Sequence, residues 1–236
     1  MRSFELHYLP IVFCLLMLAA FITSYSLSAE LGHASALFPY ISDTGSMVPE
    51  SCVFGQLLNL CAFIGTLCVY CWYSHQMERF EALGSPRSHI IHARVHLVSG
   101  LLSALGLSIV ANFQESSLLV VHMVGALVTF TFGVVYCILM SHASRAHLNS
   151  LRWLWVLRTV LAVVSALAFI LTFVFAGIAE RNQKLPHKWD PNEELYTYHA
   201  LGTTCEWLLA FCFLAIFITM IYELRDYALD PVKVMF

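Results

Sequence analysis

Seven polar residues lie in or beside apolar stretches of this chain, where their side chains could do chemistry. They are Asp43, Gln56, Asn59, Asn112, His122, His199 and Glu206. His122 and Glu206 could act as an acid–base pair, because imidazole and carboxylate groups transfer protons in many enzymes. The other side chains could hydrogen-bond a polar headgroup or another small ligand. These seven residues form the candidate ligand-binding set.

The same residues also fit a structural role, because polar side chains in membrane helices hydrogen-bond across helices and hold them together. The sequence contains no serine in a nucleophile elbow and no His-Glu-x-x-His or similar metal-ligand spacing. We therefore predict no catalytic residue, no metal and no cofactor. Three interpretations stay open: a hydrogen-bonded structural layer, a ligand pocket and a catalytic centre.

Two short motifs resemble known sites but fit simpler structures. His89, His92 and His96 are spaced to share one helical face, and they favour a solvated face over a metal site. Asp43-Thr44-Gly45 matches the triplet of aspartic proteases, but it occurs once and without a β-rich context. Because Asp and Gly both favour turns, we predict a turn there, with Asp43 able to cap the polar layer.

The elements that carry these residues are predicted to be membrane-spanning helices. Of the 236 residues, 59% are hydrophobic and 11% are charged, whereas a soluble domain carries about 25% charged residues. A helix of roughly 20 apolar residues spans the bilayer core. Six stretches qualify, at about residues 8–29, 52–73, 95–113, 118–140, 154–178 and 200–222. We predict an all-α, polytopic membrane protein with a single six-helix transmembrane domain over residues 1–236.

The distribution of Lys and Arg predicts how this bundle is oriented. Nine of the 12 lie at the termini, in the second and fourth gaps, or at Arg158, which is expected to snorkel outward. The other three, Arg181, Lys184 and Lys188, lie in the last gap. Because cytoplasmic loops are enriched in Lys and Arg, both termini are predicted to be cytoplasmic. No basic tract suits nucleic acid.

This orientation places the polar residues of the spans on one side of the membrane. Gln56, Asn59, Asn112, His122 and Glu206 are expected within roughly 10 Å of the lumenal mouths of their helices. They should face the bundle interior around Glu206, since a charge at membrane depth costs on the order of 3 kcal/mol. The cytoplasmic halves are expected to lack such a layer.

Two local patterns predict details of the bundle. Gly125, Thr129 and Gly133 recur every four residues, which predicts close internal helix packing, with self-association as the alternative. Asp190 followed by Pro191 resembles a helix start and predicts a short lumenal helix before the sixth span.

Three strings resemble the damage-regulated autophagy modulator (DRAM) family. They are Pro39-Tyr40-Ile41-Ser42-Asp43-Thr44-Gly45, Ile109-Val110-Ala111-Asn112-Phe113-Gln114-Glu115 and Cys205-Glu206-Trp207. The resemblance covers nearly the whole chain in order, with a matching helix count. It implies a multi-pass protein of lysosomal or other endomembranes that promotes autophagy, linked in some members to apoptosis. Membrane lipids and proteins of autophagy or lysosomal trafficking are the implied partners.

The wider group resembles Sfk-type plasma-membrane proteins and Frag-type factors that remodel GPI anchors. This leaves an alternative function open, in which the protein modifies or binds lipids at a lumenal polar site around Glu206 and His122. It also leaves the plasma membrane as the alternative location. The resemblance carries over no agreed catalytic residues.

Overall fold

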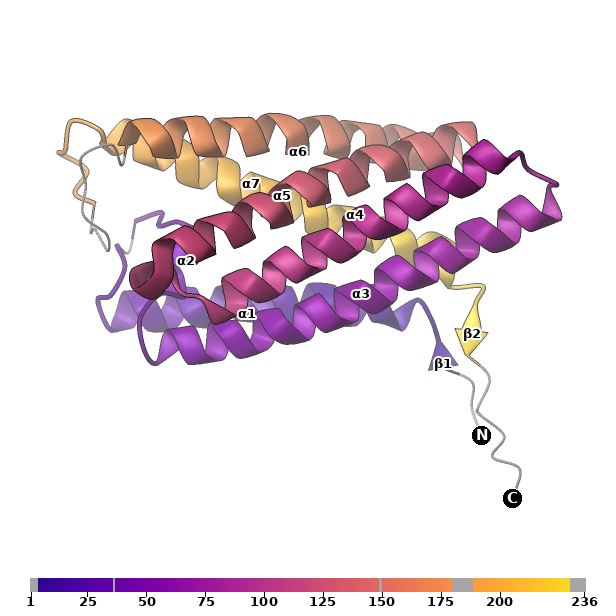
Figure 1. Ribbon diagram of the computed structural model, residues 1–236. Coiled ribbons are helices and arrows are strands. Elements are labelled where there is room, and N and C mark those ends of the chain that lie inside the picture. The colour runs from indigo at the N-terminus through magenta and orange to yellow at the C-terminus, as the bar shows by residue number, and fades with distance from the viewer. Residues whose placement is uncertain (1–3, 36, 149, 180–188, 230–236) are drawn as a thin grey trace, which may run out of the picture.

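The computed structural model describes residues 4–35, 37–148, 150–179 and 189–229 (Figure 1). Six long helices and one short helix dominate these residues. In chain order the elements are β1 (Phe4–Glu5), α1 (Tyr8–Glu30), α2 (Ile41–Thr44), α3 (Glu50–Ala82), α4 (Arg87–Asn112), α5 (Glu115–Ala146), α6 (Arg152–Ala179), α7 (Tyr196–Leu224) and β2 (Ala228–Leu229). The six long helices are long and apolar enough to cross a membrane. The prediction of an all-α bundle with six spanning helices is confirmed.

The helices extend beyond the apolar stretches that predicted them. α3 continues to Ala82 and α4 already begins at Arg87, so a short turn joins them. Hydropathy marks only the part of a helix that lipid surrounds, whereas backbone hydrogen bonding continues into the polar ends. In α5 the backbone at Leu118 is not helical (φ −135°, ψ 64°), and this kink coincides with the predicted start of the fourth span.

The predicted short helix before the sixth span is wrong. Asp190 and the residues after it form turns, and α7 begins only at Tyr196. The Asp190 carboxylate accepts a hydrogen bond from the Asn192 N–H at 2.8 Å, while the Asp190 N–H donates to the Glu193 carboxylate at 2.9 Å. The acidic side chains thus bond within the turn and offer the backbone an alternative to a helix.

The basic residues Arg2, Arg181, Lys184, Lys188 and Lys233 lie outside the described residues.

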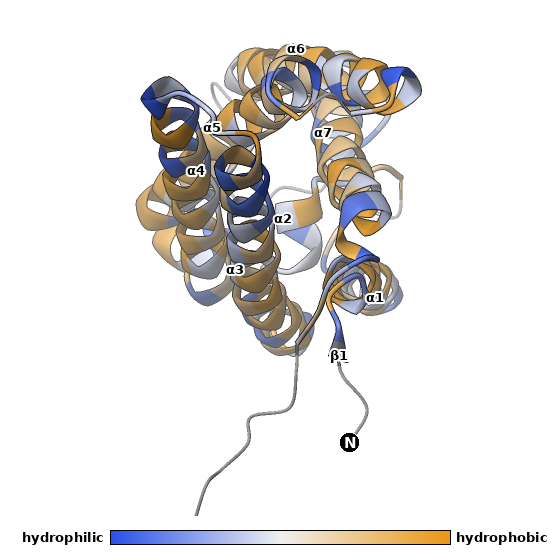
Figure 2. Ribbon diagram, turned by 90° about the vertical axis from the view of Figure 1, so that its right-hand side faces the viewer, coloured by the Kyte–Doolittle hydropathy of each residue, from blue (hydrophilic) through white to orange (hydrophobic). Residues whose placement is uncertain are grey.

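The six long helices form a ring that follows the order of the chain (Figure 2). Each long helix packs against the next, and α7 also contacts α1, which closes the ring. β1 and β2 pair antiparallel, so both terminal segments lie at the same end of the bundle. We call this the terminal end and the opposite one, which holds α2, the distal end. That the terminal end faces the cytosol stays a prediction from the charge pattern.

Glycine allows the backbones of α4 and α5 to approach closely. A Cβ added at Gly106 would lie 2.6 Å from the Thr129 nitrogen and 2.8 Å from the Gly125 carbonyl oxygen. A Cβ added at Gly125 would in turn lie 2.7 Å from the Ile109 side chain. The small residues of α4 and α5 thus pack against each other inside the bundle. The predicted internal packing is confirmed.

Gly106→Ala is expected to lower the free energy of unfolding by about 1–3 kcal/mol, because the new methyl group would overlap the backbone of α5. The thermal stability of the detergent-purified protein measures this effect. Gly177→Ala on α6 is the matched control, since nothing lies within 4 Å of its added Cβ. Equal stability of Gly106→Ala and the wild type would contradict the close packing.

Arg158 points into the bundle, so the expectation that it snorkels outward is wrong. Its side chain is fully buried and makes two 2.8 Å contacts with the Glu223 carboxylate. It also donates to Ser144 Oγ at 2.7 Å and to Thr219 Oγ1 at 2.9 Å. Its guanidinium lies 4.8 Å from the centre of the Trp72 ring. Paired in this way, a charge can stay inside a bundle.

The terminal half of the bundle also contains a second buried polar pair. His96 Nδ1 lies 3.2 Å from Gln76 Oε1, and both residues are buried between α3 and α4. Together with the Arg158 cluster, this pair shows that the terminal half has its own polar layer. The expectation that the predicted cytoplasmic halves lack one is wrong, because several of these residues lie just outside the apolar stretches.

Candidate functional site

The distal end of the ring is closed by α2, and α7 holds the segment around it in place. Glu206 Oε2 accepts a hydrogen bond of 2.6 Å from the Ile41 N–H, in a buried position. The indole N–H of the next residue, Trp207, donates to the Pro39 carbonyl oxygen at 3.0 Å. Two neighbouring side chains of α7 thus bond backbone groups at or just before the first residue of α2. The Glu206-Trp207 pair therefore fixes the start of α2.

Side chains at the other end of α2 complete its attachment. Asp43 Oδ2 accepts from the Tyr40 N–H at 3.3 Å, and Thr44 Oγ1 lies 2.9 Å from Ser24 Oγ on α1. Gly45 is the C-cap residue of this single helical turn. Asp43 and Thr44 are thus the last two residues of a one-turn helix and Gly45 is its C-cap, where a turn was predicted. A Cβ at Gly202 would overlap the Tyr40 hydroxyl, so the glycine lets the segment pack directly on α7.

A cavity of about 140 Å³ lies inside the ring. Side chains from α1, α3, α4, α5 and α7 line it, together with Ile41 and Ser42 of α2. Most of the lining is apolar, including Phe13, Leu58 and Phe213, and the two candidate residues His122 and Glu206 are part of it. The cavity can therefore hold an apolar group and offers polar side chains to it.

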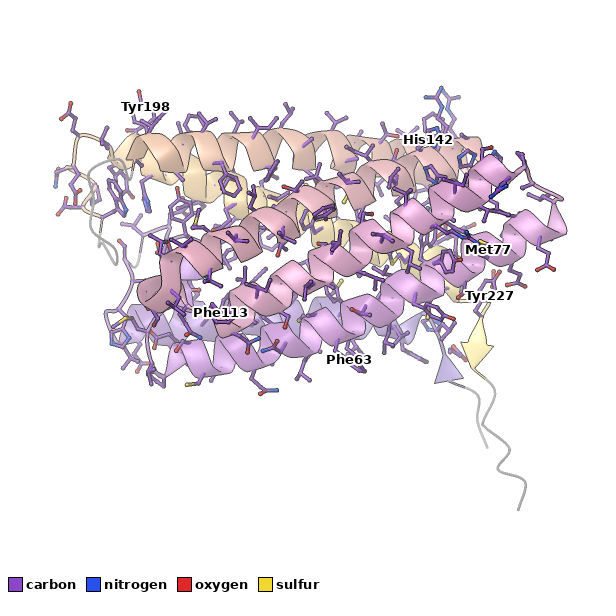
Figure 3. The ribbon with its side chains drawn as sticks, in the orientation of Figure 1. Phe63, Met77, Phe113, His142, Tyr198 and Tyr227 are labelled. Atoms are coloured by element: carbon purple, nitrogen blue, oxygen red, sulfur yellow. The ribbon has the colours of Figure 1, made fainter. Side chains whose placement is uncertain are left out.

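His122 and Glu206 line the same cavity, but each is engaged with backbone. His122 is 4% exposed, and its Nδ1 donates to the Phe113 carbonyl oxygen at 2.8 Å, which ties α5 to the end of α4. Figure 3 labels Phe113 at the distal end. This is the satisfied interhelical donor that membrane helices commonly use. The expected interior positions of His122 and Glu206 are confirmed.

Asp43 and His199 meet in a second, smaller pocket of about 10 Å³, which His33, Ser46 and Trp189 also line. A pocket of this size has room for roughly one water molecule. The His199 ring stacks on Trp189 at 4.6 Å and meets the edge of Tyr40 at 5.1 Å. Asp43 and His199 thus come together, beside α2 rather than in the central cavity.

Gln56, Asn59 and Asn112 do not face the bundle interior, so this part of the prediction is wrong. Gln56 and Asn112 are exposed, and Asn59 is half-buried. The Asn59 and Asn112 amides bond each other at 3.1 Å and 3.0 Å, and Ser108 Oγ donates to Asn59 Oδ1 at 2.8 Å. Because the two amides satisfy each other, they need no interior position. As ligand-binding residues, all three stay a prediction.

The sequence analysis missed one contact between a histidine and a buried carboxylate at the distal end. His33 Nδ1 lies 2.6 Å from Glu50 Oε1, and the Glu50 side chain is fully buried. The contact joins the loop after α1 to the first turn of α3. In the sequence, Glu50 is an acidic residue directly before an apolar stretch, and it lies outside the predicted span.

The comparisons with known proteins extend over the residues that build this end. Residues 5–227 match a family model described as "Frag1/DRAM/Sfk1/Cwh43P N-terminal domain". The chain belongs to this family. The predicted DRAM resemblance is confirmed by relatives that cover most of the chain.

One relative of this DRAM-family chain is human DNA damage-regulated autophagy modulator protein 1. It is 38% identical over 216 residues, which is 89% of this chain and 87% of the relative. Rat DNA damage-regulated autophagy modulator protein 2 is 34% identical over 95% of this chain and 85% of its own length. The Xenopus laevis modulator of macroautophagy TMEM150B-B is 41% identical over 114 residues, 48% of this chain and 46% of the relative. No solved structure matches the chain.

The three strings that carry the DRAM resemblance meet at the distal end. The first contains α2, the third contains Glu206 and Trp207, and hydrogen bonds join them. The second ends at the α4–α5 turn, where Ser116 just beyond it donates to the Ser46 carbonyl oxygen at 2.6 Å. The three strings thus belong to one hydrogen-bonded cap over the cavity.

Proposed function

We propose that this protein modulates autophagy from an endomembrane, by holding an apolar ligand such as a lipid chain in its central cavity. The observation that carries the proposal is the mostly apolar cavity inside the ring, with His122 and Glu206 in its wall. The names of the relatives, autophagy modulators in human and rat, support the cellular role. The lysosome is the proposed compartment, and membrane lipids are the proposed partners.

The chemistry of the lining supports a ligand with an apolar body and a polar tip. Ligand sites are mostly apolar, with a few polar groups that fix orientation. Glu206 and His122 supply such groups, and α2 lies between the cavity and the distal surface with Ile41 and Ser42 in its lining. Because Glu206 bonds the backbone of α2, a ligand that competes for this carboxylate would loosen α2. Ligand occupancy would then be coupled to the shape of the distal surface.

Filling the cavity tests this proposal. Ala104 on α4 lines the cavity, so Ala104→Phe is expected to exclude the ligand. Its neighbour Leu105 is 56% exposed on the outer face, and Leu105→Phe adds a ring there as the matched control. Native mass spectrometry measures the ligand that co-purifies, and autophagic flux in cells lacking the endogenous protein measures function.

The expected result is that Ala104→Phe loses both the bound ligand and the rescue of flux, while Leu105→Phe keeps both. Ala126→Phe on the neighbouring helix α5 fills the same cavity from a second position. Two filling variants on different helices separate the effect of occupancy from a folding defect at one position. If the filled variants fold and restore full flux, the cavity has no part in the function.

The alternative function is modification of a lipid at the same polar groups. Its support is that His122 and Glu206 line one cavity, as an acid–base pair would. A catalytic Glu206 predicts a change in cellular lipids on deletion of the protein, which wild type reverses and Glu206→Gln does not. If Glu206→Gln reverses the change at an equal protein level, this carboxylate is not catalytic.

A further inference from the structure

Four histidines from two helices gather at the terminal end of the bundle. His89 and His92 lie in the first two turns of α4, while His142 and His147 lie at the end of α5 and directly after it. Figure 3 labels His142 near the end of α5. One ring nitrogen from each of His92, His142 and His147 lies within 4.8 Å of the other two. The site is distant from the cavity groups of the proposed function, and the inference goes beyond that function.

The spacing inside this group fits a transition-metal ion. His142 Nδ1 lies 3.3 Å from His92 Nε2. Two nitrogens that each lie about 2.0–2.1 Å from a tetrahedral zinc ion are about 3.4 Å apart. The third ring, His147, lies with its centre 4.9 Å from that of His92 and 4.8 Å from that of His142. The three nitrogens lie within 4.8 Å of one another, so they would approach by up to about 1.4 Å to reach the spacing of a tetrahedral zinc site.

One ring nitrogen of the third histidine has no partner in the protein. Nδ1 of His147 is buried and has no hydrogen-bond partner among the residues that the structure describes, while Nε2 of His92 and Nδ1 of His142 face each other. Buried polar atoms are normally satisfied, so the His147 nitrogen points to a partner that completes the site. Neutral imidazole is the commonest metal ligand in proteins.

The charge around the group does not oppose a cation. The Arg145 guanidinium, the cation of the last turn of α5, lies 5.1 Å over the Trp155 ring and so packs on α6. The His89 ring packs on His147 at 3.9 Å and supports its orientation.

We propose that His92, His142 and His147 bind one Zn²⁺ ion at the terminal end of the bundle. Three imidazoles leave the fourth position of a tetrahedral ion open for water or a group from a partner. The exposed His142 lies at the surface, so the open position is reachable from outside. The ion would join the start of α4 to the end of α5.

The spacing within α4 did not reveal this site. His89, His92 and His96 predict a shared solvated face, but His96 is buried and bonds Gln76. The ligands that join His92 come from α5, and His142 lies 50 positions further along the chain. Only the folded bundle places the two helix ends together.

Zinc titration of the full-length protein tests the proposal. The protein is purified in detergent with an affinity tag that contains no histidine, stripped with a chelator and titrated against a chromophoric zinc indicator. One Zn²⁺ per chain is expected. His142→Gln is the main variant, because an exposed side chain can be changed without disturbing the core. His7→Gln is the matched control, outside the group at the same end.

His142→Gln is expected to weaken binding by more than the roughly 10- to 100-fold that loss of an outer-shell partner costs. Co²⁺ bound to the wild type should show visible d–d absorption, and His92→Gln and His142→Gln should lose it while His7→Gln keeps it. If His142→Gln and His92→Gln bind Zn²⁺ as tightly as the wild type, or if the wild type binds none, the proposal is wrong.

Discussion

Arg158→Ala is expected to lower the free energy of unfolding by about 3–5 kcal/mol, as removal of one partner of a buried ion pair does. The Glu223 carboxylate would stay behind with 11% of its side chain exposed and without its cation. Ser144 Oγ and Thr219 Oγ1 would each lose the same guanidinium donor. The variant should therefore be poorly expressed or unfold at a markedly lower temperature.

Thermal unfolding of the detergent-purified protein, followed by size-exclusion chromatography, measures this loss. Arg152→Ala is the matched control, because Arg152 lies on the same helix and is exposed. An exposed charge of this kind changes stability by roughly 1 kcal/mol or less. Both variants lose one positive charge, so the difference between their stabilities measures the effect of burying that charge in its network.

The double variant Arg158→Met, Glu223→Leu separates pairing from packing. Replacing both members of a buried pair by apolar residues of similar volume is often neutral. The double variant is therefore expected to be more stable than Arg158→Ala. If Arg158→Ala is as stable as Arg152→Ala, the network between α5, α6 and α7 contributes nothing to stability.

The number of long helices could be predicted because lipid restricts the chain so strongly. A spanning helix must be continuously apolar, and only six stretches satisfy this condition. The helix ends were less predictable. α3 and α4 meet at residues 83–86 although their apolar parts end at about residue 73 and begin at about residue 95. Polar helical turns beyond the bilayer leave no hydropathy signal.

The direction in which each polar side chain points could not be predicted from these helices. A helix that is apolar all round lacks the amphipathic stripe that identifies a buried face. Arg158 was therefore expected outside and lies inside, while Asn59 and Asn112 were expected inside and pair on the outside. Their positions depend on partners from other helices, which the sequence does not connect.

Glu206 shows how far the site itself could be predicted. Its burial was predicted from the free-energy cost of a carboxylate in lipid, and the side chain is buried in the structure. Its partner could not be predicted, because the Ile41 N–H lies 165 positions earlier, at the start of α2. Almost every residue has a backbone N–H, so the sequence does not show which one a side chain will bond. The role of Glu206 in holding α2 therefore appears only in the folded chain.

Glu206→Ala is expected to release α2 from the distal end while the spanning helices stay folded. The variant leaves the buried Ile41 N–H without its acceptor, which costs about 1–3 kcal/mol. A cost of this size makes local opening roughly 5- to 140-fold more frequent, since each 1.4 kcal/mol is a factor of ten. Glu206→Gln keeps a carbonyl oxygen at the same place and should have a much smaller effect.

Hydrogen–deuterium exchange of the detergent-purified protein measures this opening at the amides of Thr44, Gly45 and Ser46, which bond back to Tyr40, Ser42 and Asp43. Their exchange should accelerate in Glu206→Ala and stay near the wild-type rate in Glu206→Gln. Leu208→Ala, on the exposed face of the same helix, is the control for a loss of side-chain volume. Unchanged exchange of these amides in Glu206→Ala would mean that the carboxylate does not hold α2, and that the other anchors of the cap suffice.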